Sequence, residues 1–244
     1  MKVVLLGGTR GIGRAIARAL AERGAELFVL GRDPAALARS RCDLELRGAA
    51  KVGSAPCDLL EPAGFETALA EAEATLGGLD TVILTAGIQA DQATLERDPA
   101  LLEKVLLADF VHSVAFCEAA RRRLLARGGG TLCVLSSVAG DRARASIGLY
   151  GAAKAGLTHY LEGLDHGYRR AGLRTVCVKP GFVRTGLTDG LPEPPFAADP
   201  EVVARHVLRA IERGRPVAYV PPIWRVVMAV VGALPRALMR RLRF

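Results

Sequence analysis

The amino-acid sequence predicts an α/β protein with one doubly wound parallel sheet of about seven strands and helices on both faces. Three observations support this prediction: short apolar runs recur along the chain, segments of helical periodicity lie between them, and the first run leads into a glycine-rich turn. Near-continuous apolar strands indicate burial on both faces, as in a parallel sheet. Strands that alternate with helices indicate repeated βαβ units.

The apolar runs define the expected strands in chain order. Each run is rich in Val, Leu and Ile, except for a weaker candidate at residues 51–57. After the first strand, Ala15, Ile16, Ala19 and Leu20 recur at helical spacing, which predicts a helix with one apolar face. The expected strands are residues 2–6, 26–30, 51–57, 81–84, 131–135, 174–178 and 217–220.

Length and composition limit the class of protein. The chain has 244 residues, of which 50% are hydrophobic and 24% charged, so it can bury a core and is not expected to be disordered. The strand–helix alternation ends near residue 220, which predicts one domain at residues 1–220 and an appendage at residues 221–244. We find no uncharged apolar run of about 18 residues and no signal-peptide pattern, so we expect a cytoplasmic protein without a transmembrane helix.

The cysteines and histidines do not indicate a metal site or a disulfide framework. The five cysteines are far apart and none belongs to a Cys-x-x-Cys pair, so we expect reduced thiols. The four histidines fall mostly on helical stretches and lack ligand-like spacing. No metal site is therefore predicted.

A glycine-rich turn connects the first strand with the first helix. It reads Gly7-Gly8-Thr9-Arg10-Gly11-Ile12-Gly13. Glycines permit a tight turn and bring backbone N–H groups close to a pyrophosphate at the helix N-terminus, where the helix dipole favours anions. Because the turn lies directly between strand and helix, it indicates a Rossmann-type dinucleotide-binding fold rather than ordinary packing.

The end of the second strand favours NADP(H) over NAD. NAD usually meets an acidic residue about 20 positions after the glycines. Here Asp33 precedes Pro34, a pattern that predicts a helix cap and occupies the carboxylate locally. Arg32 would then face the ribose and Arg10 can approach the same point, where two guanidiniums would bind a 2′-phosphate. The alternative is that both arginines are solvated surface side chains.

A serine, a tyrosine and a lysine occur at a spacing that suits proton transfer. Ser137 follows the strand at residues 131–135, Tyr150 lies thirteen residues after it, and Lys154 lies four residues further on. Tyr150 and Lys154 share one helical face. A nearby ammonium favours the phenolate and so lowers a tyrosine pKa from its ordinary value of about 10. In isolation such a pair is usually an ordinary tyrosine and a surface lysine, so the surrounding motifs decide its meaning.

Four motifs follow one another along the chain: Gly7-x-x-x-Gly11-x-Gly13, Ser137, Tyr150-x-x-x-Lys154 and Pro180-Gly181-x-Val183-x-Thr185. In this order they resemble the classical short-chain dehydrogenase/reductase family, over residues 1 to about 220. The resemblance implies that Tyr150 is the general acid/base, that Lys154 lowers its pKa and holds the nicotinamide ribose, and that Ser137 orients the substrate carbonyl. With the arginines above, the expected cofactor-binding residues are Gly7, Thr9, Arg10, Gly11, Ile12, Gly13, Arg32, Asp58, Leu59, Ala86, Gly87, Tyr150, Lys154, Pro180, Gly181, Val183 and Thr185.

Three positions depart from the family pattern. Leu6 replaces the threonine before the first glycine, and Leu84-Thr85-Ala86-Gly87 keeps only the end of the family's Asn-Asn-Ala-Gly motif. Asp109 replaces the asparagine that the family uses, with a bound water, to relay protons to the lysine. As an anion Asp109 would position water and strengthen the Lys154 ammonium, whereas in a dry pocket it would be a neutral acid of raised pKa. Asp109 is therefore a further candidate catalytic residue.

The appendage combines an apolar run with arginines. Residues 205–244 hold nine arginines and a single acid, whereas the preceding residues hold equal numbers of bases and acids. An apolar run that contains Trp224 precedes an amphipathic pattern with arginines on one face. Such a segment suits peripheral membrane contact through residues 223–244, since each basic residue near an anionic bilayer contributes about 1 kcal/mol. Packing on the body or across a dimer interface is the other interpretation.

The expected function is hydride transfer between NADP(H) and a ketone or secondary alcohol. Residues 186–200 stand where the family places its substrate lid and are rich in apolar side chains, among them Leu191 and Pro192. Family members that reduce keto groups on lipid-linked substrates have similar tails, so we expect a small-molecule or lipid-like carbonyl substrate. The resemblance also implies a homo-dimer or homo-tetramer. The alternatives are a non-catalytic NADP-binding protein and nucleic-acid binding through the tail, although no aromatic residues alternate with the arginines there.

Overall fold

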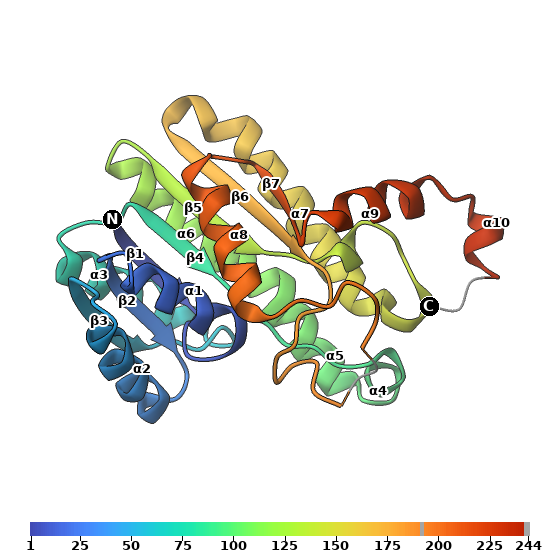
Figure 1. Cartoon of the computed structure of the whole chain (residues 1–244), viewed down its shortest axis with the longest axis horizontal. Helices are drawn as coiled ribbons and strands as arrows, with labels where there is room; N and C mark the ends of the chain where they lie inside the picture. The colour runs from blue at the N-terminus through green and yellow to red at the C-terminus, as the bar shows by residue number, and fades with distance from the viewer. Residues whose placement is uncertain (191–192, 242–244) are drawn as a thin grey trace.

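The strands form one parallel sheet in a computed structural model that describes residues 1–190 and 193–241. Within these residues the strands are β1 (Lys2–Leu6), β2 (Glu26–Gly31), β3 (Lys51–Pro56), β4 (Thr81–Leu84), β5 (Gly130–Leu135), β6 (Leu173–Pro180) and β7 (Val217–Val220). Their order is β3-β2-β1-β4-β5-β6-β7 (Figure 1), and all neighbours are parallel. The predicted doubly wound sheet of seven strands is therefore confirmed, including the weaker candidate, which is the edge strand β3.

Helices cover both faces of the sheet, as expected. The helices α3 (Phe65–Leu76), α6 (His112–Ala126) and α7 (Gly148–Tyr168) pack on one face, where Phe65 and Phe116 meet edge to face. The helices α1 (Gly11–Ala21), α2 (Pro34–Leu46) and α8 (Pro200–Glu212) pack on the other face. Three short elements lie between β4 and α6: the helices α4 (Gln92–Arg97) and α5 (Pro99–Leu106) and the π-helical turn η2 (Leu107–Val111).

The chain reverses its winding direction between β1 and β4, and this point positions the site. Open α/β sheets bind ligands outside the carboxyl ends of their strands, at the position where the strand order reverses. β1 ends at Leu6 and β4 at Leu84, and the two ends are tied together because Thr85 donates two hydrogen bonds to the Leu6 carbonyl, from its backbone N–H (2.9 Å) and its hydroxyl (3.1 Å). Thr85, which stands in the altered family motif, therefore fixes the floor of this crevice.

The appendage begins directly after β7 and forms two helices, α9 (Ile223–Ala233) and α10 (Arg236–Met239). Figure 1 shows both helices, in red, extending from the body at the right of the view. One side of α9 contacts the body: Met228 is buried, and Trp224 lies against Gly181. Residues 242–244, where the sequence predicts the end of the basic amphipathic pattern, lie outside the described residues. Over residues 1–190 and 193–241 we find no helix that is long and apolar enough to cross a bilayer.

Candidate active site

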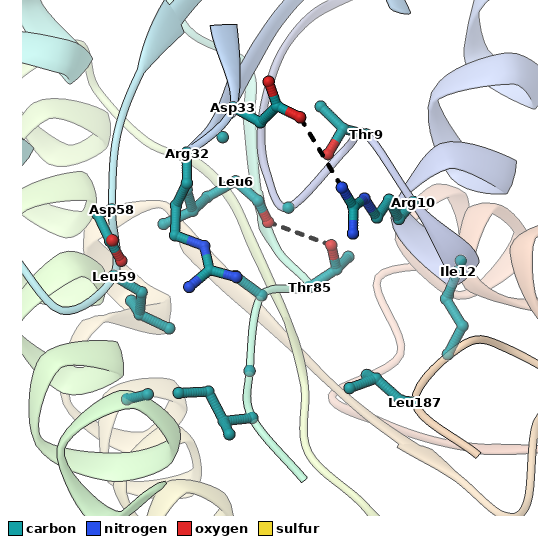
Figure 2. A pocket seen from close by; sticks show the side chains of 18 of the residues that line it. Leu6, Thr9, Arg10, Ile12, Arg32, Asp33, Asp58, Leu59, Thr85 and Leu187 are labelled. Carbon is teal, nitrogen blue, oxygen red and sulfur yellow. Dashed lines mark hydrogen bonds and ion pairs between the residues drawn. The ribbon is translucent and has the colours of Figure 1, made fainter. Parts of the chain in front are cut away.

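A cavity of about 390 Å³ lies at the predicted crevice, between the ends of β1, β2 and β4 and the start of α1 (Figure 2). Twelve of the residues expected to bind the cofactor line it: Gly7, Thr9, Arg10, Gly11, Ile12, Gly13, Arg32, Asp58, Leu59, Ala86, Gly87 and Thr185. They come from five separate segments of the chain, so the fold brings together what the sequence places far apart.

The glycine-rich turn has the geometry that a dinucleotide needs. Gly7 has a φ of +96°, which strongly favours glycine, and its N–H donates to the Leu30 carbonyl (2.9 Å). A Cβ atom at Gly13 would lie only 2.2 Å from the Gly7 carbonyl oxygen, so α1 can pack this closely on the turn only with glycine there. No side chain caps the N-terminus of α1 at Arg10, which leaves its first N–H groups free to bind an anion. The turn therefore fits a pyrophosphate.

The two arginines expected at the ribose differ in their surroundings. Asp33 caps α2 as predicted, since one carboxylate oxygen accepts the N–H groups of Ala35 and Ala36 at 2.9 and 3.2 Å. Its other oxygen lies 3.8 Å from the Arg10 guanidinium, so Arg10 is turned toward Asp33. Arg32 extends into the cavity between Asp58 and Arg10 (Figure 2). Both predicted arginines thus line the cavity, but Arg10 has Asp33 as an ion-pair partner, whereas Arg32 has none among residues 1–190 and 193–241.

The predicted catalytic pair lies on α7, next to this cavity. The Lys154 ammonium lies 5.6 Å from the centre of the Tyr150 ring, and it donates a hydrogen bond of 3.2 Å to Asp109. A Cβ atom at Gly87 would lie 2.5 Å from the Asp109 carboxylate and 3.5 Å from the Lys154 nitrogen. Because Gly87 lines the cavity, both groups lie directly behind its wall.

Asp109, the predicted replacement for the family's asparagine, lies next to Lys154. It lies fully buried on the π-helical turn η2, where one carboxylate oxygen accepts the Ile88 N–H (3.1 Å) as well as the Lys154 ammonium. Burial raises the pKa of Asp109, while Lys154 and the Ile88 N–H act to lower it. Burial acts to lower the pKa of Lys154, but the charge of Asp109, the neighbouring Tyr150 and the hydrogen bond to Asp109 together raise this pKa above its ordinary value. Lys154 is therefore a cation throughout the physiological pH range.

The pKa of Tyr150 differs from the expectation. Burial raises this pKa above 10 and Asp109 raises it further, whereas Lys154 and a hydrogen bond with the Ser137 hydroxyl act to lower it. Lys154 thus acts in the predicted direction, but burial outweighs it. Tyr150 is accordingly a protonated phenol, which is the form that donates a proton. The neighbouring Ser136 has a structural role, since its hydroxyl donates to the Lys154 carbonyl (3.0 Å) and so fixes α7 on the end of β5.

Comparison with known proteins decides the family. The profile of the short chain dehydrogenase family matches residues 1–195. The chain is a short-chain dehydrogenase/reductase. The family membership that the motifs indicated is therefore confirmed. The protein is an oxidoreductase of a family that uses a nicotinamide cofactor.

Several oxidoreductases align with most or nearly all of the chain. An uncharacterized oxidoreductase of Mycobacterium tuberculosis is 34% identical over 98% of this chain and 96% of that protein. An uncharacterized oxidoreductase of Streptomyces coelicolor is 38% identical over 98% of this chain and 95% of that protein. The human 3-oxoacyl-[acyl-carrier-protein] reductase is 29% identical over 78% of each chain. A short-chain type dehydrogenase/reductase from Mycobacterium ulcerans has the same fold, with a TM-score of 0.82 and 22% identity over 89% of this chain and 87% of that one.

Five predicted cofactor residues of this short-chain dehydrogenase/reductase do not line the cavity: Tyr150 and Lys154, which lie next to it, and Pro180, Gly181 and Val183. The Val183 side chain is buried in the core that α8 covers. Trp224 of α9 covers Gly181 so closely that a Cβ atom there would lie 2.0 Å from the indole nitrogen. Sequence reasoning missed this contact because nothing local relates a tryptophan after β7 to a glycine after β6. Only Thr185 of this motif reaches the cavity, next to Gly11.

A second buried ionic cluster was also missed. The Lys179 ammonium contacts the Asp141 carboxylate at 2.5 Å, and the Tyr219 hydroxyl donates to the other Asp141 oxygen (2.8 Å). Lys179 directly precedes the Pro180-Gly181 turn, and Asp141 follows Ser137 by four residues. The cluster therefore joins two segments that border the site. A lysine at the end of an otherwise apolar strand is the one signal in the sequence that points to it.

Metal ligation receives no support from the arrangement of potential ligands. Across residues 1–190 and 193–241 we find no group of three or more His, Cys, Asp or Glu side chains that could hold a metal ion. Four of the cysteines, Cys57, Cys117, Cys133 and Cys177, are buried thiols, and Cys42 is an exposed one.

Proposed function

We propose that the protein is an NADPH-dependent reductase of ketones that also catalyses the reverse oxidation of secondary alcohols. The observation that carries this proposal is the placement of Lys154 and Asp109 directly behind the cavity wall at Gly87, with the Tyr150 ring beside the Lys154 ammonium. NADPH, when bound, supplies the hydride. Retention of this arrangement argues against a non-catalytic nucleotide-binding protein, since simple binding does not need a protonated phenol beside a buried ammonium.

Each side chain has a separate task in this proposal. Tyr150 donates its proton to the carbonyl oxygen as negative charge develops there. Lys154 stabilises the phenolate that remains, and Asp109 keeps Lys154 cationic and fixes its position. Ser137, which is hydrogen-bonded to Tyr150, orients the carbonyl oxygen toward the phenol.

The proposed substrate is a carbonyl compound with an apolar portion. Leu187 lines the cavity and is 55% exposed, and Phe196 from the same lid segment is 53% exposed. Leu191 and Pro192 of the predicted lid lie outside the described residues. Relatives named as carbonyl reductase family member 4 in Xenopus tropicalis and as 3-oxoacyl-[acyl-carrier-protein] reductase in humans support a carbonyl substrate.

The proposal includes a cytoplasmic homo-dimer or homo-tetramer. Phe110 and Val111, on the π-helical turn and next to α6, are 36% and 48% exposed. Large apolar side chains at such positions suit an interface between copies of the chain.

The direct test is an absorbance assay of NADPH oxidation with a panel of aliphatic ketones. We expect turnover that requires the ketone and is faster with NADPH than with NADH. A protein that binds NADPH tightly but oxidises it no faster with any ketone than without one would establish the non-catalytic alternative.

Arg32 is predicted to determine the preference for NADPH. Replacing Arg32 with alanine should raise the KM for NADPH by about 10- to 150-fold and leave the KM for NADH nearly unchanged, since hydrogen bonds to charged groups contribute about 1.5–3 kcal/mol. Arg10→Ala should have a smaller effect, because Arg10 is 82% exposed and turned toward Asp33. Arg39→Ala, an exposed arginine on α2, is the matched control. Equal KM changes for both cofactors in Arg32→Ala would contradict the NADP assignment.

Asp109→Asn is predicted to move the pH dependence of the reaction to lower pH. The amide can still accept hydrogen bonds from Ile88 and Lys154, but the negative charge that raises the pKa of Tyr150 is lost. The Tyr150 pKa should therefore fall, so that alcohol oxidation, which needs the phenolate, begins at a lower pH than in wild type. The measurement is kcat/KM against pH in both directions. A profile identical to wild type would show that Asp109 does not act on Tyr150.

A further inference from the structure

The appendage exposes several large apolar side chains. Ile223, Val226 and Val230 of α9 are 40%, 61% and 60% exposed, and Leu238 of α10 is 42% exposed. The first three recur at i, i+3 and i+7, so they form one continuous stripe along α9. We call these three residues of α9 the outer tail face; Leu238 adds an exposed apolar side chain on α10. Singly exposed apolar residues are ordinary, but a contiguous row on a projecting helix indicates a binding surface.

The orientation of this stripe is fixed by the opposite side of α9. Trp224 lies against Gly181 and meets Phe196 edge to face at 6.3 Å, and Met228 is buried. Arg142 donates a hydrogen bond to the Leu234 carbonyl at the end of the helix. The body thus holds α9 from one side and leaves the outer tail face directed away from it, as Figure 1 shows for the helix as a whole.

The charge of the appendage is entirely positive. Arg225, Arg236, Arg240 and Arg241 are all exposed, and residues 221–244 contain no acid. A second copy of the chain bound through this face would bring these arginines close together, and like charges across an interface are unfavourable. A nucleic acid would use the arginines but leave the apolar stripe exposed to water. An anionic bilayer surface satisfies both features, because its phosphates attract the arginines and its acyl chains accept the apolar side chains.

We propose that the outer tail face docks the protein on the surface of an anionic membrane. The eleven residues of α9 are too short to cross a bilayer, so the helix lies in the plane of the interface. Because the inner side of the same helix contacts Phe196 and Gly181, docking would place the substrate lid next to the lipid. This last consequence rests on the proposed function: an apolar ketone would enter the site from the bilayer.

Co-sedimentation with vesicles tests the docking. The full-length protein should bind vesicles that contain phosphatidylglycerol, with binding that weakens as salt is added, and should bind phosphatidylcholine vesicles weakly. The triple variant Arg236→Ala/Arg240→Ala/Arg241→Ala should lose on the order of 100-fold in affinity. Val226→Glu/Val230→Glu should also abolish binding. The matched controls are Arg14→Ala/Arg39→Ala/Arg170→Ala and Leu46→Glu, which change exposed residues elsewhere and should bind as wild type does.

Three results would overturn the proposal. The first is that the wild-type protein fails to sediment with anionic vesicles at low salt, and the second is that the tail variants bind these vesicles as well as the control variants do. The third is that Val226→Glu/Val230→Glu dissociates an oligomer in light scattering, which would show that the face binds a second copy of the chain. Reduction of a water-soluble ketone is measured in parallel and should be unchanged in the tail variants. If the protein does not bind vesicles but still reduces the water-soluble ketone, only the membrane proposal is wrong. If it binds vesicles but does not reduce the ketone, only the proposed function is wrong.

Discussion

Tyr150→Phe is expected to lower the rate of NADPH-dependent ketone reduction by about 100- to 10,000-fold, the usual contribution of general acid catalysis. The substitution removes a single oxygen atom and with it the only proton that our proposal delivers to the substrate. The ring itself, which lies beside the Lys154 ammonium, remains in place. We therefore expect kcat to fall while the affinity for NADPH, measured by fluorescence titration, changes little.

The matched control for this variant is Tyr160→Phe. Tyr160 lies on the same helix, and its hydroxyl donates to Glu118 (2.7 Å), away from the cavity. The substitution Tyr160→Phe also removes one phenol oxygen from α7 but leaves the proposed proton donor intact. Ketone reduction should therefore stay near the wild-type rate. If Tyr150→Phe and Tyr160→Phe turn over ketones equally well, Tyr150 is not the acid and the assignment of the reaction fails.

The strands and the cavity were predictable because their signals are local. A buried parallel strand must be apolar along most of its length, and the turn after β1 must contain glycine where Gly7 adopts a positive φ and Gly13 packs on the backbone. Twelve of the residues that the motifs single out as cofactor-binding candidates line the cavity. In each case the residue type is determined by its own backbone position, so a single sequence carries the information.

Other features depend on which residues meet in space. The contact of Trp224 with Gly181 and the pairing of Arg10 with Asp33 join segments whose relative placement no local pattern specifies. The pKa of Tyr150 illustrates the same limit in energetic terms. Helical spacing correctly indicates that Lys154 acts to lower this pKa, but the larger effect of burial depends on everything packed around the ring.

Lys179→Met is expected to lower the free energy of unfolding by about 3–5 kcal/mol, the usual effect of removing one partner from a buried ion pair. Lys179 is 7% exposed and belongs to the cluster with Asp141 and Tyr219. Methionine fills much of the space but leaves the Asp141 carboxylate with the Tyr219 hydroxyl as its remaining partner in this cluster. Urea unfolding of this variant and of Lys51→Met, which alters an exposed lysine, would measure the difference.

The pH dependence of this difference gives a sharper test. In the folded protein the Asp141 and Tyr219 contacts raise the pKa of Lys179 above its ordinary value of 10.5, despite the opposing effect of burial. A group with a raised pKa binds its proton more tightly in the native state than in the unfolded state. Its contribution to the free energy of unfolding is therefore complete below pH 10.5 and is lost as the pH rises through the folded-state pKa. The difference in the free energy of unfolding between wild type and Lys179→Met should therefore be constant from neutral pH to about pH 9.5 and shrink above pH 10.5. A gap that is small at neutral pH, or one that widens in alkali, would show that the ammonium does not stabilise the fold through Asp141.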